Sequence, residues 1–401
     1  MTLIDSGDAH AGSRVAPGVI NPLAGRKLKP TWRVVEQLPV ALQFYRDLES
    51  ASGERFFHPT KIIRVVKDAR QRKELDKRLD EPESLEFIGQ YHAPNTLGPA
   101  FRDDYGSVIT DSAGWVELDV LCRLLTEPVR AAGRLCEGVF DYEQLEVGEG
   151  SVRYAGEGHG AVIFCEGWRG MHNPFLKSIP WNPARGEMLE LRLKGEPFLP
   201  PDLRGAILNC GKWLLPLGGD RYRAGASYAW EDFDAPPTPE KREEILRVLG
   251  RFLDREFEVL GQVTGVRPVV KDYHPVLGRV ASAGNEGLSA RRLTRQRGSA
   301  PTLTRPWLGA SPQTLRVCPS SLRSVPSVAT PERKAFDETE NESPRPLTQR
   351  MSSADTHMHV FNGLGSKGVL MGPWCSALMT DYLLDRKPLP ADVDVARFAS
   401  S

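Results

Sequence analysis

The sequence has few of the features that mark several large classes of proteins. No run approaches the roughly 18 consecutive apolar residues that a membrane-spanning helix needs, so no membrane partner is expected. The charges are balanced at 52 basic and 52 acidic side chains, which excludes the strongly basic signature of a dedicated nucleic-acid binder. The 6 cysteines are far apart and form no Cys-x-x-Cys pair, so neither a zinc site nor a dense disulfide framework is predicted. With no charged-then-apolar leader at the N-terminus, a cytoplasmic protein is expected.

The composition is that of a globular enzyme. The 401 residues, 40% of them hydrophobic, provide enough apolar material for one large domain or two ordinary ones. Apolar residues at helical spacing predict helices over residues 32–48, 69–79, 116–133 and 239–253. Trp115 is expected on the core face of the third helix, and Thr238 is expected to cap the fourth. Short strands are predicted from Gly186 to Tyr228. Strand-helix units at both ends with an antiparallel block between them predict a mixed α/β protein with two interleaved lobes.

One tract differs in kind from the rest of the chain. Ala281 to Asp355 contains no Ile and no Tyr, and its first 50 residues hold 7 arginines against a single acid, Glu286. Such a composition cannot bury a core. It predicts a disordered insertion or an artefactual stretch that a short turn could replace. The alternative is contact with RNA through the basic residues 291–323.

The N-terminal residues suggest part of a nucleotide-binding unit. Met1 to Asp5 is a short apolar run that ends in an acid and is followed by a turn. In dinucleotide-binding folds, an acid at the end of the second strand binds the adenosine ribose about 20 residues after a glycine-rich turn. We therefore expect a strand and a G-x-G-x-x-G turn to be encoded upstream of Met1. The alternative is that Asp5 simply ends an exposed strand.

Two glycine motifs occur later in the chain. Gly363 to Gly368 matches G-x-G-x-x-G and lies between a predicted strand and a predicted helix from Val369 to about Leu384. No second strand follows, so it is not the primary dinucleotide fingerprint. It can still bind an anion at the helix N-terminus, although a plain turn explains it equally well. Gly156 to Ala161 lies between two strand-like runs, at residues 151–154 and 161–165, and is interpreted as a hairpin turn.

Six local strings occur in a characteristic order. They are Ser13 to Pro22 with Gly25-Arg26, Val162 to Gly167, Gly186-Glu187, Gly265 to Pro268 with Lys271-Asp272, His274 to Arg279, and Phe361 to Gly368. Together they resemble the FAD-dependent oxidoreductases of the D-amino-acid oxidase and glycine oxidase superfamily, over nearly all of the chain except Ala281 to Asp355. The oxidase half of the bifunctional wobble-uridine tRNA-modifying enzyme is a more distant relative.

The resemblance implies an α/β (mixed α+β) fold. A Rossmann-like FAD-binding domain is expected to be interleaved with an antiparallel-sheet substrate domain. The FAD-binding domain would comprise residues 1–53, which lack its N-terminal strand and turn, with 113–185, 265–280 and 356–401. The substrate domain would comprise residues 54–112 and 186–264, and residues 281–355 would be the insertion.

The resemblance also implies a cofactor site. Asp5 takes the position of the acid that holds the FAD ribose, and Ser13 to Gly18 matches the loop beside the pyrophosphate and flavin. The turn after Ile163 packs near the adenosine half, and the loop at Gly363 presents a helix N-terminus to the flavin pyrimidine, where reduced flavin is negative. The cofactor-binding residues implied are Asp5, Ser13, Arg14, Ala16, Gly18, Cys165, Glu166, Gly167, Gly363, Leu364, Gly365, Ser366, Lys367 and Gly368.

On the substrate side, Arg267 corresponds to the arginine that binds a substrate carboxylate by a bidentate pair. The alternative for Arg267 is a structural salt bridge. Tyr228 and Trp230 are weaker candidates for lining the substrate, because a role as buried aromatics explains them almost as well.

These residues lead us to expect an FAD-dependent enzyme that oxidises the C–N bond of a small amine or amino acid, with oxygen as the acceptor. The flavin carries the chemistry, so no catalytic side chain or metal is required. One alternative is a non-catalytic remnant that cannot bind FAD, and another is the RNA-contacting protein. Without the first strand and turn, we expect the 401-residue chain to bind FAD poorly.

Overall fold

The computed structural model describes residues 1–8, 11–25, 27–148, 151–195, 199–280 and 357–399. The predictions for Ala281 to Asp355, both as an insertion and as an RNA contact through residues 291–323, lie outside the described residues. In the ranges that are described, none of the helices combines the length and apolar character that crossing a membrane requires.

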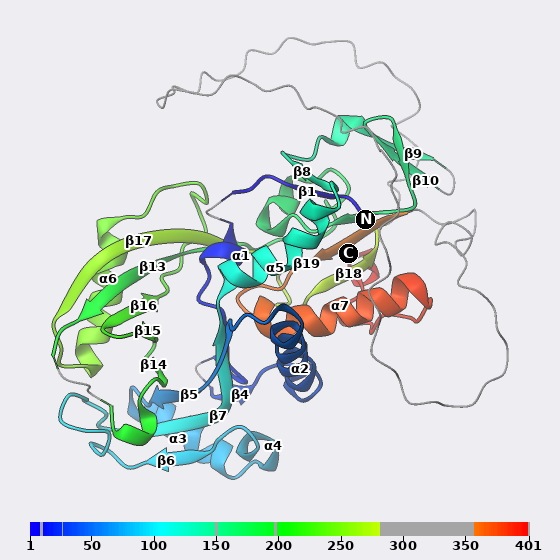
Figure 1. Ribbon diagram of the computed structural model, residues 1–401. Helices are drawn as coiled ribbons and strands as arrows, with labels where there is room; N and C mark the ends of the chain where they lie inside the picture. The colour runs from blue at the N-terminus through cyan, green and yellow to red at the C-terminus, as the bar shows by residue number, and fades with distance from the viewer. Residues whose placement is uncertain (9–10, 26, 149–150, 196–198, 281–356, 400–401) are drawn as a thin grey trace. The chain divides into compact units, whose positions relative to one another are not determined.

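A nine-stranded, largely antiparallel sheet is the main element of the fold (Figure 1). Its strands, from one edge to the other, are β17 (Phe257–Arg267), β13 (Ala184–Leu193), β16 (Arg221–Gly225), β15 (Trp213–Gly218), β14 (Ile207–Asn209), β5 (Phe57–Val65), β7 (Ser107–Val116) and β2 (Val19–Ile20), with β6 (Gln90–His92) paired to β7. The pairing of β14 with β5 is parallel. The sheet therefore joins strands from distant parts of the chain.

The remaining strands form small sheets. β1 (Leu3–Asp5) pairs in parallel with β8 (Leu135–Glu137). β19 (Met358–Asn362) lies between β12 (Val162–Phe164), which is parallel to it, and β18 (Val276–Arg279), which is antiparallel. β9 (Leu145–Gly148), β10 (Ser151–Tyr154) and β11 (Glu157–His159) form a meander, and β3 (Leu23–Ala24) pairs with β4 (Lys29–Pro30).

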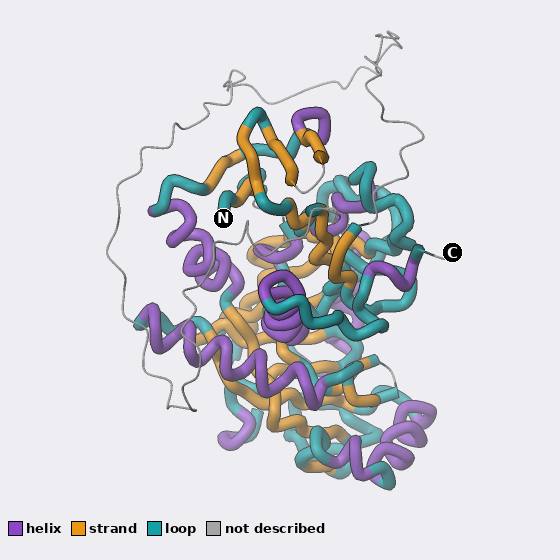
Figure 2. The backbone as a smooth tube through the Cα atoms, turned by 90° about the vertical axis from the view of Figure 1, so that its right-hand side faces the viewer, coloured by secondary structure: helices purple, strands orange, loops and turns teal. Residues whose placement is uncertain are grey.

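Helices cover these sheets, as the side view in Figure 2 shows in purple. They are α1 (Gly12–Val15), α2 (Val34–Ser52), α3 (Ala69–Leu79), α4 (Pro82–Leu85), α5 (Leu118–Ala131), α6 (Pro239–Phe252) and α7 (Gly368–Leu384). α6 buries Ile245 and Leu249 against Leu189 and Leu191 of β13. α2 lies beside α7, where the Tyr45 hydroxyl donates to the Val369 carbonyl over 2.7 Å.

The predicted helices are confirmed, with changes at their ends. Thr238 caps α6 by accepting a hydrogen bond from the Lys241 amide. Trp115 was wrongly placed on a helix face: it lies in β7, opposite His58 of β5, and the helix begins only at Leu118. The strand extends to Val116 because the Val116 amide donates a hydrogen bond to the Gly18 carbonyl, next to β2. An amide bonded to a neighbouring segment in this way does not take part in a helix.

The hairpin around Gly156 also differs from the prediction. Its second strand is Glu157–His159, which pairs with Ser151–Tyr154. The run Val162–Phe164 leaves the meander and pairs with β19 instead. Phe164 becomes buried there against Val360 and Phe175, which explains why an almost continuously apolar strand prefers the parallel sheet.

Candidate functional site

Arg267 is a half-buried cation at the end of β17. It lies opposite Ala184 of β13, and its guanidinium is 4.4 Å from the centre of the Tyr228 ring. Nη1 donates weakly to the Ala184 carbonyl over 3.4 Å. Burial lowers the pKa of Arg267, and no carboxylate among the described residues acts on it. The structural salt bridge considered as the alternative is therefore not formed by the described residues, and the guanidinium can bind an anion.

Gly186 leaves the room that this guanidinium occupies. A Cβ atom at Gly186 would lie only 2.4 Å from both terminal nitrogens of Arg267. Real Cβ contacts do not come so close, so a side chain here would displace Arg267. The glycine of the Gly186-Glu187 string is therefore explained by the space that the Arg267 side chain needs.

The aromatic residues above Arg267 are exposed, not buried. Tyr228 is 50% exposed and Trp230 is 61% exposed, and their rings stack with centroids 6.3 Å apart. This corrects the alternative that they are core aromatics. Ala229 fixes the segment between them, because it exchanges backbone hydrogen bonds of 2.8 and 2.9 Å with Arg185. The rings thus present a flat surface next to a cation.

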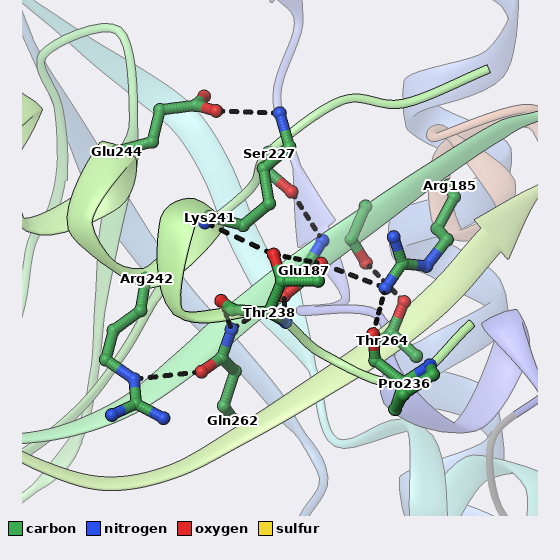
Figure 3. A network of polar contacts seen from close by, with 11 residues as sticks. Arg185, Glu187, Ser227, Pro236, Thr238, Lys241, Arg242, Glu244, Gln262 and Thr264 are labelled. Carbon is green, nitrogen blue, oxygen red and sulfur yellow. Dashed lines mark hydrogen bonds and ion pairs between the residues drawn. The ribbon is translucent and has the colours of Figure 1, made fainter. Parts of the chain in front are cut away.

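A buried ionic network holds this segment in place (Figure 3). Glu187 is fully buried and Arg185 is 4% exposed, and they form an ion pair of 2.9 Å. The Glu187 carboxylate also accepts from the Thr238 amide at 2.8 Å and from Gln262 Nε2 at 2.6 Å. Ser227 Oγ accepts from the Glu187 amide. The sequence analysis did not predict this network. The signal in the sequence was the pair of opposite charges that flanks Gly186 at the start of a strand.

The N-terminal loop brings Asp5 and Arg14 together, and Ser13 directly precedes Arg14 in α1. Asp5 ends β1, and its carboxylate accepts from the Gly7 amide at 3.0 Å and from Arg14 Nη2 at 3.3 Å. Both side chains of this ion pair are about one-third exposed, at 37% and 35%. α1 also meets the end of β17, because a Cβ at Gly12 would lie 2.8 Å from the Val266 carbonyl. The predicted cofactor loop therefore lies one residue from Arg267.

Gly18 anchors the other end of this loop, beyond Ala16. Its φ is +68°, and a Cβ would lie 2.0 Å from the Val116 carbonyl oxygen. Its own carbonyl accepts from the Val116 amide over 3.0 Å. Only glycine fits this close approach of two backbones.

The loop from Gly363 to Gly368 reaches the same place from the other side. Gly363 and Gly365 have φ of +75° and +56°, and the Gly365 amide donates to the Pro268 carbonyl over 3.1 Å. Leu364 packs against the core, Ser366 is exposed, and α7 begins at Gly368. The helix N-terminus, which is positive, thus follows directly on a loop bonded next to Arg267.

The turn from Cys165 to Gly167 is bonded to the residue that directly precedes the Gly363 loop. Asn362 Nδ2 at the end of β19 donates to the Gly167 carbonyl over 2.9 Å. The Glu166 carboxylate accepts from the Tyr142 hydroxyl and, at 2.7 Å, from Asn173 Nδ2. Both carboxylate oxygens of Glu166 therefore already accept from other side chains of the protein, and its predicted contact with a cofactor stays a prediction.

A mixed α/β fold with a glycine loop before a helix N-terminus is a common setting for nucleotide cofactors. The sequence profile of the FAD dependent oxidoreductase family matches residues 1–382, and the chain belongs to this family. FAD is the cofactor of the family, as the resemblance implied, and the expected fold class is confirmed.

Several known proteins are similar to the chain. It is 24% identical over 294 residues to the tRNA 5-methylaminomethyl-2-thiouridine biosynthesis bifunctional protein of Idiomarina loihiensis, with 70% of this chain and 46% of that protein aligned. The chain thus spans about half the length of that relative. Glycine oxidase from Geobacillus kaustophilus shares its fold with a TM-score of 0.65 and 15% identity, over 98% of this chain and 90% of that one. Iminodiacetate oxidase from Chelativorans sp. BNC1 shares the fold with a TM-score of 0.64 and 15% sequence identity, over 97% of this chain and 90% of that one.

The described residues fit a flavin at the pyrimidine end. There, half-buried Lys367 has no acidic partner among the described residues, and the positive end of α7 adds to its charge. The ring atoms N1 and C2=O of a flavin are acceptors that become negative on reduction, so this environment suits them.

Proposed function

We propose that this chain oxidises the C–N bond of an amine or amino acid whose carboxylate binds Arg267. The observation that carries the proposal is Arg267 itself, a half-buried guanidinium on which no acid among the described residues acts and over which Tyr228 stacks. Its terminal nitrogens can donate to both oxygens of a carboxylate. The Gly363 loop lies next to Arg267, because the Gly365 amide donates a hydrogen bond to the carbonyl of Pro268.

The cofactor would lie between this loop and α1. We propose that Asp5 binds the ribose, that Ser13, Arg14, Ala16 and Gly18 line the pyrophosphate and flavin, and that the loop from Gly363 to Gly368 holds the pyrimidine. The proximity of Gly12 to Val266, and of Gly365 to Pro268, supports this assignment. The turn Cys165 to Gly167 is assigned to the adenosine side.

The domain division follows from the same assignment. We propose that residues 54–112 and 186–264 form the substrate domain, and that residues 1–53, 113–185, 265–280 and 356–401 form the FAD-binding domain. Most strands of the nine-stranded sheet come from the first set, which supports the division.

FAD supplies the hydride acceptor in this family of reactions, and oxygen is the proposed oxidant that returns it to the oxidised state. The chain's own residues then have two tasks. Arg267 orients the substrate by its carboxylate, and the rings of Tyr228 and Trp230 line the substrate side of the site. The product imine is hydrolysed to a carbonyl compound and an amine.

The test compares Arg267→Met with Arg169→Met in the FAD-reconstituted protein. Arg169 is a matched control because it also stacks on an aromatic ring, Trp168, but its side chain is 57% exposed. We expect Arg267→Met to weaken binding of amino acids about a hundredfold, to affect amines without a carboxylate little, and to leave FAD bound. Loss of FAD with unchanged amino-acid binding would assign Arg267 to the cofactor. A wild-type protein without flavin absorbance would favour the non-catalytic alternative.

A second candidate substrate is an amine carried on a tRNA base, as the name of the Idiomarina relative suggests for that protein. The exposed stacked pair Tyr228 and Trp230 favours it, because aromatic side chains stack bases of single-stranded RNA. Competition between free amino acids and an RNA stem-loop for the same site separates the two candidates.

A further inference from the structure

Lys212 is a buried cation on the side of the large sheet that α6 covers. It directly precedes β15 and is 8% exposed. Its Nζ atom donates to the Glu244 carboxylate of α6 over 2.8 Å and to the Ala226 carbonyl over 2.7 Å. The carboxylate compensates the buried charge, as a buried cation requires. The bond to Ala226 has a different consequence, because it ties α6 to the segment that follows β16.

The segment that follows β16 carries Tyr228. β13 holds the middle and the end of this segment, because the amides of Ser227 and Ala229 donate to β13 carbonyls over 3.1 and 2.9 Å. Lys212 holds its start, at Ala226. The backbone is therefore bonded on both sides of Tyr228, and the direction in which its ring points is set by these bonds.

Lys212 and Arg267 lie on opposite faces of the sheet. Side chains of a strand alternate between the two faces. Leu189 of β13 packs with α6, so Ala184, five residues earlier, points to the other face. Arg267 lies opposite Ala184 and shares its face. Lys212, bonded to α6, thus acts on the site through the segment of Tyr228, whose ring centre is 4.4 Å from the guanidinium.

We propose that Lys212 is a positioning residue for Tyr228, which its bond to Ala226 keeps stacked over Arg267. This inference rests on the proposed function, in which Arg267 binds the substrate carboxylate. A ring held against the guanidinium restricts the conformations of Arg267, so less side-chain freedom is lost when a carboxylate binds. Without the bond, the start of the segment could shift, and the ring would lie over Arg267 for less of the time.

The test compares Lys212→Met with Lys241→Met in the FAD-reconstituted protein. Lys241 is a matched control, because its Nζ atom donates to the other oxygen of Glu244 over 3.0 Å, and both of these residues lie on α6 (Figure 3). Titration calorimetry measures binding of glycine, sarcosine and norvaline, with butylamine as a probe without a carboxylate.

We expect Lys212→Met to weaken binding of at least one of these amino acids by about fivefold to tenfold, the share that a cation–π contact contributes. Binding of butylamine and of FAD should stay unchanged, as should all affinities in Lys241→Met. In turnover, the KM for the amino acid should rise while kcat changes little, because the carboxylate contact is the same in the ground and transition states. Equal weakening in both variants, or of butylamine and amino acids alike, would overturn the proposal.

A double-mutant cycle separates positioning from a general structural effect. In a Tyr228→Leu background, Lys212→Met should weaken amino-acid binding by less than about twofold, because the ring that it positions is absent. An undiminished loss in that background would show that Lys212 acts by another route. Tyr228→Leu alone must also weaken amino-acid binding, and an unchanged affinity would overturn the proposal even if Lys212→Met does not fold.

Arg267→Met distinguishes this inference from the proposed function. Unchanged amino-acid binding in Arg267→Met would overturn both. A loss of binding in Arg267→Met with none in Lys212→Met would overturn only the role of Lys212.

Discussion

The two sides of the proposed site are built differently. On the substrate side, β13 pairs with β17 along its whole length and with β16 from Met188 to Arg192, and its first six residues are buried. On the cofactor side, β1 has three residues, is half-buried throughout, and pairs in the described chain with β8 alone. The difference teaches that Arg267 and Tyr228 are positioned by the large sheet, whereas Asp5 lies on a short strand with little support of its own.

The largest expected effect comes from the buried network on the substrate side. Glu187→Gln would leave Arg185 buried without its counter-ion, and we expect a loss of about 3–5 kcal/mol in unfolding free energy. Denaturant unfolding measures it. The control is Glu190→Gln on the same strand, whose bonds to Arg221 and Arg223 are long, at 3.4 Å each, and partly exposed. It should cost about 1 kcal/mol or less. Equal losses of unfolding free energy in the two variants would show that the buried network contributes no more to stability than the partly exposed ion pairs.

A smaller effect is expected where the cofactor loop joins the large sheet. Gly18→Ala combines a φ of +68° with a Cβ that would lie 2.0 Å from the Val116 carbonyl, so we expect a loss of roughly 3 kcal/mol. Gly53→Ala is matched in conformation, with a φ of +71°, but has nothing within 4 Å. It should cost only about 1–2 kcal/mol. Thermal unfolding of both variants tests this prediction. The same loss in both would show that the close approach of Gly18 to Val116 adds nothing to the cost of the positive φ.

The sequence predicted the helices and loops that residue spacing alone determines. α6 follows from its apolar spacing and its Thr238 cap, and the glycine loop before α7 follows from its spacing. The pairing of Val162 with Met358 does not, because it joins residues almost 200 apart whose partners no local pattern specifies. Glu187 was missed because burial of a charge depends on the surrounding strands.

Hydrogen exchange would compare the two sides directly. We expect the amides of Leu3 to Asp5 to exchange about tenfold to a hundredfold faster than those of Leu189 to Leu191, because short, half-buried strands open locally at low cost. Added FAD should slow exchange in β1 and leave β13 unchanged. Equal protection without FAD would mean that β1 is held as firmly as the large sheet.

The smallest effect concerns Asp5, the proposed ribose ligand. Asp5→Asn should weaken FAD binding by about tenfold, because an amide oxygen accepts a hydroxyl proton less strongly than a carboxylate does. Stability should change by less than about 1 kcal/mol, because the ion pair with Arg14 is partly exposed. Glu137→Gln is the control: Glu137 lies opposite Asp5 in β8 and forms an exposed ion pair of 3.1 Å with Arg130. Fluorescence titration with FAD should separate the two variants. If both weaken FAD alike, the effect arises from the general charge of this small sheet, and Asp5 has no specific contact with the ribose.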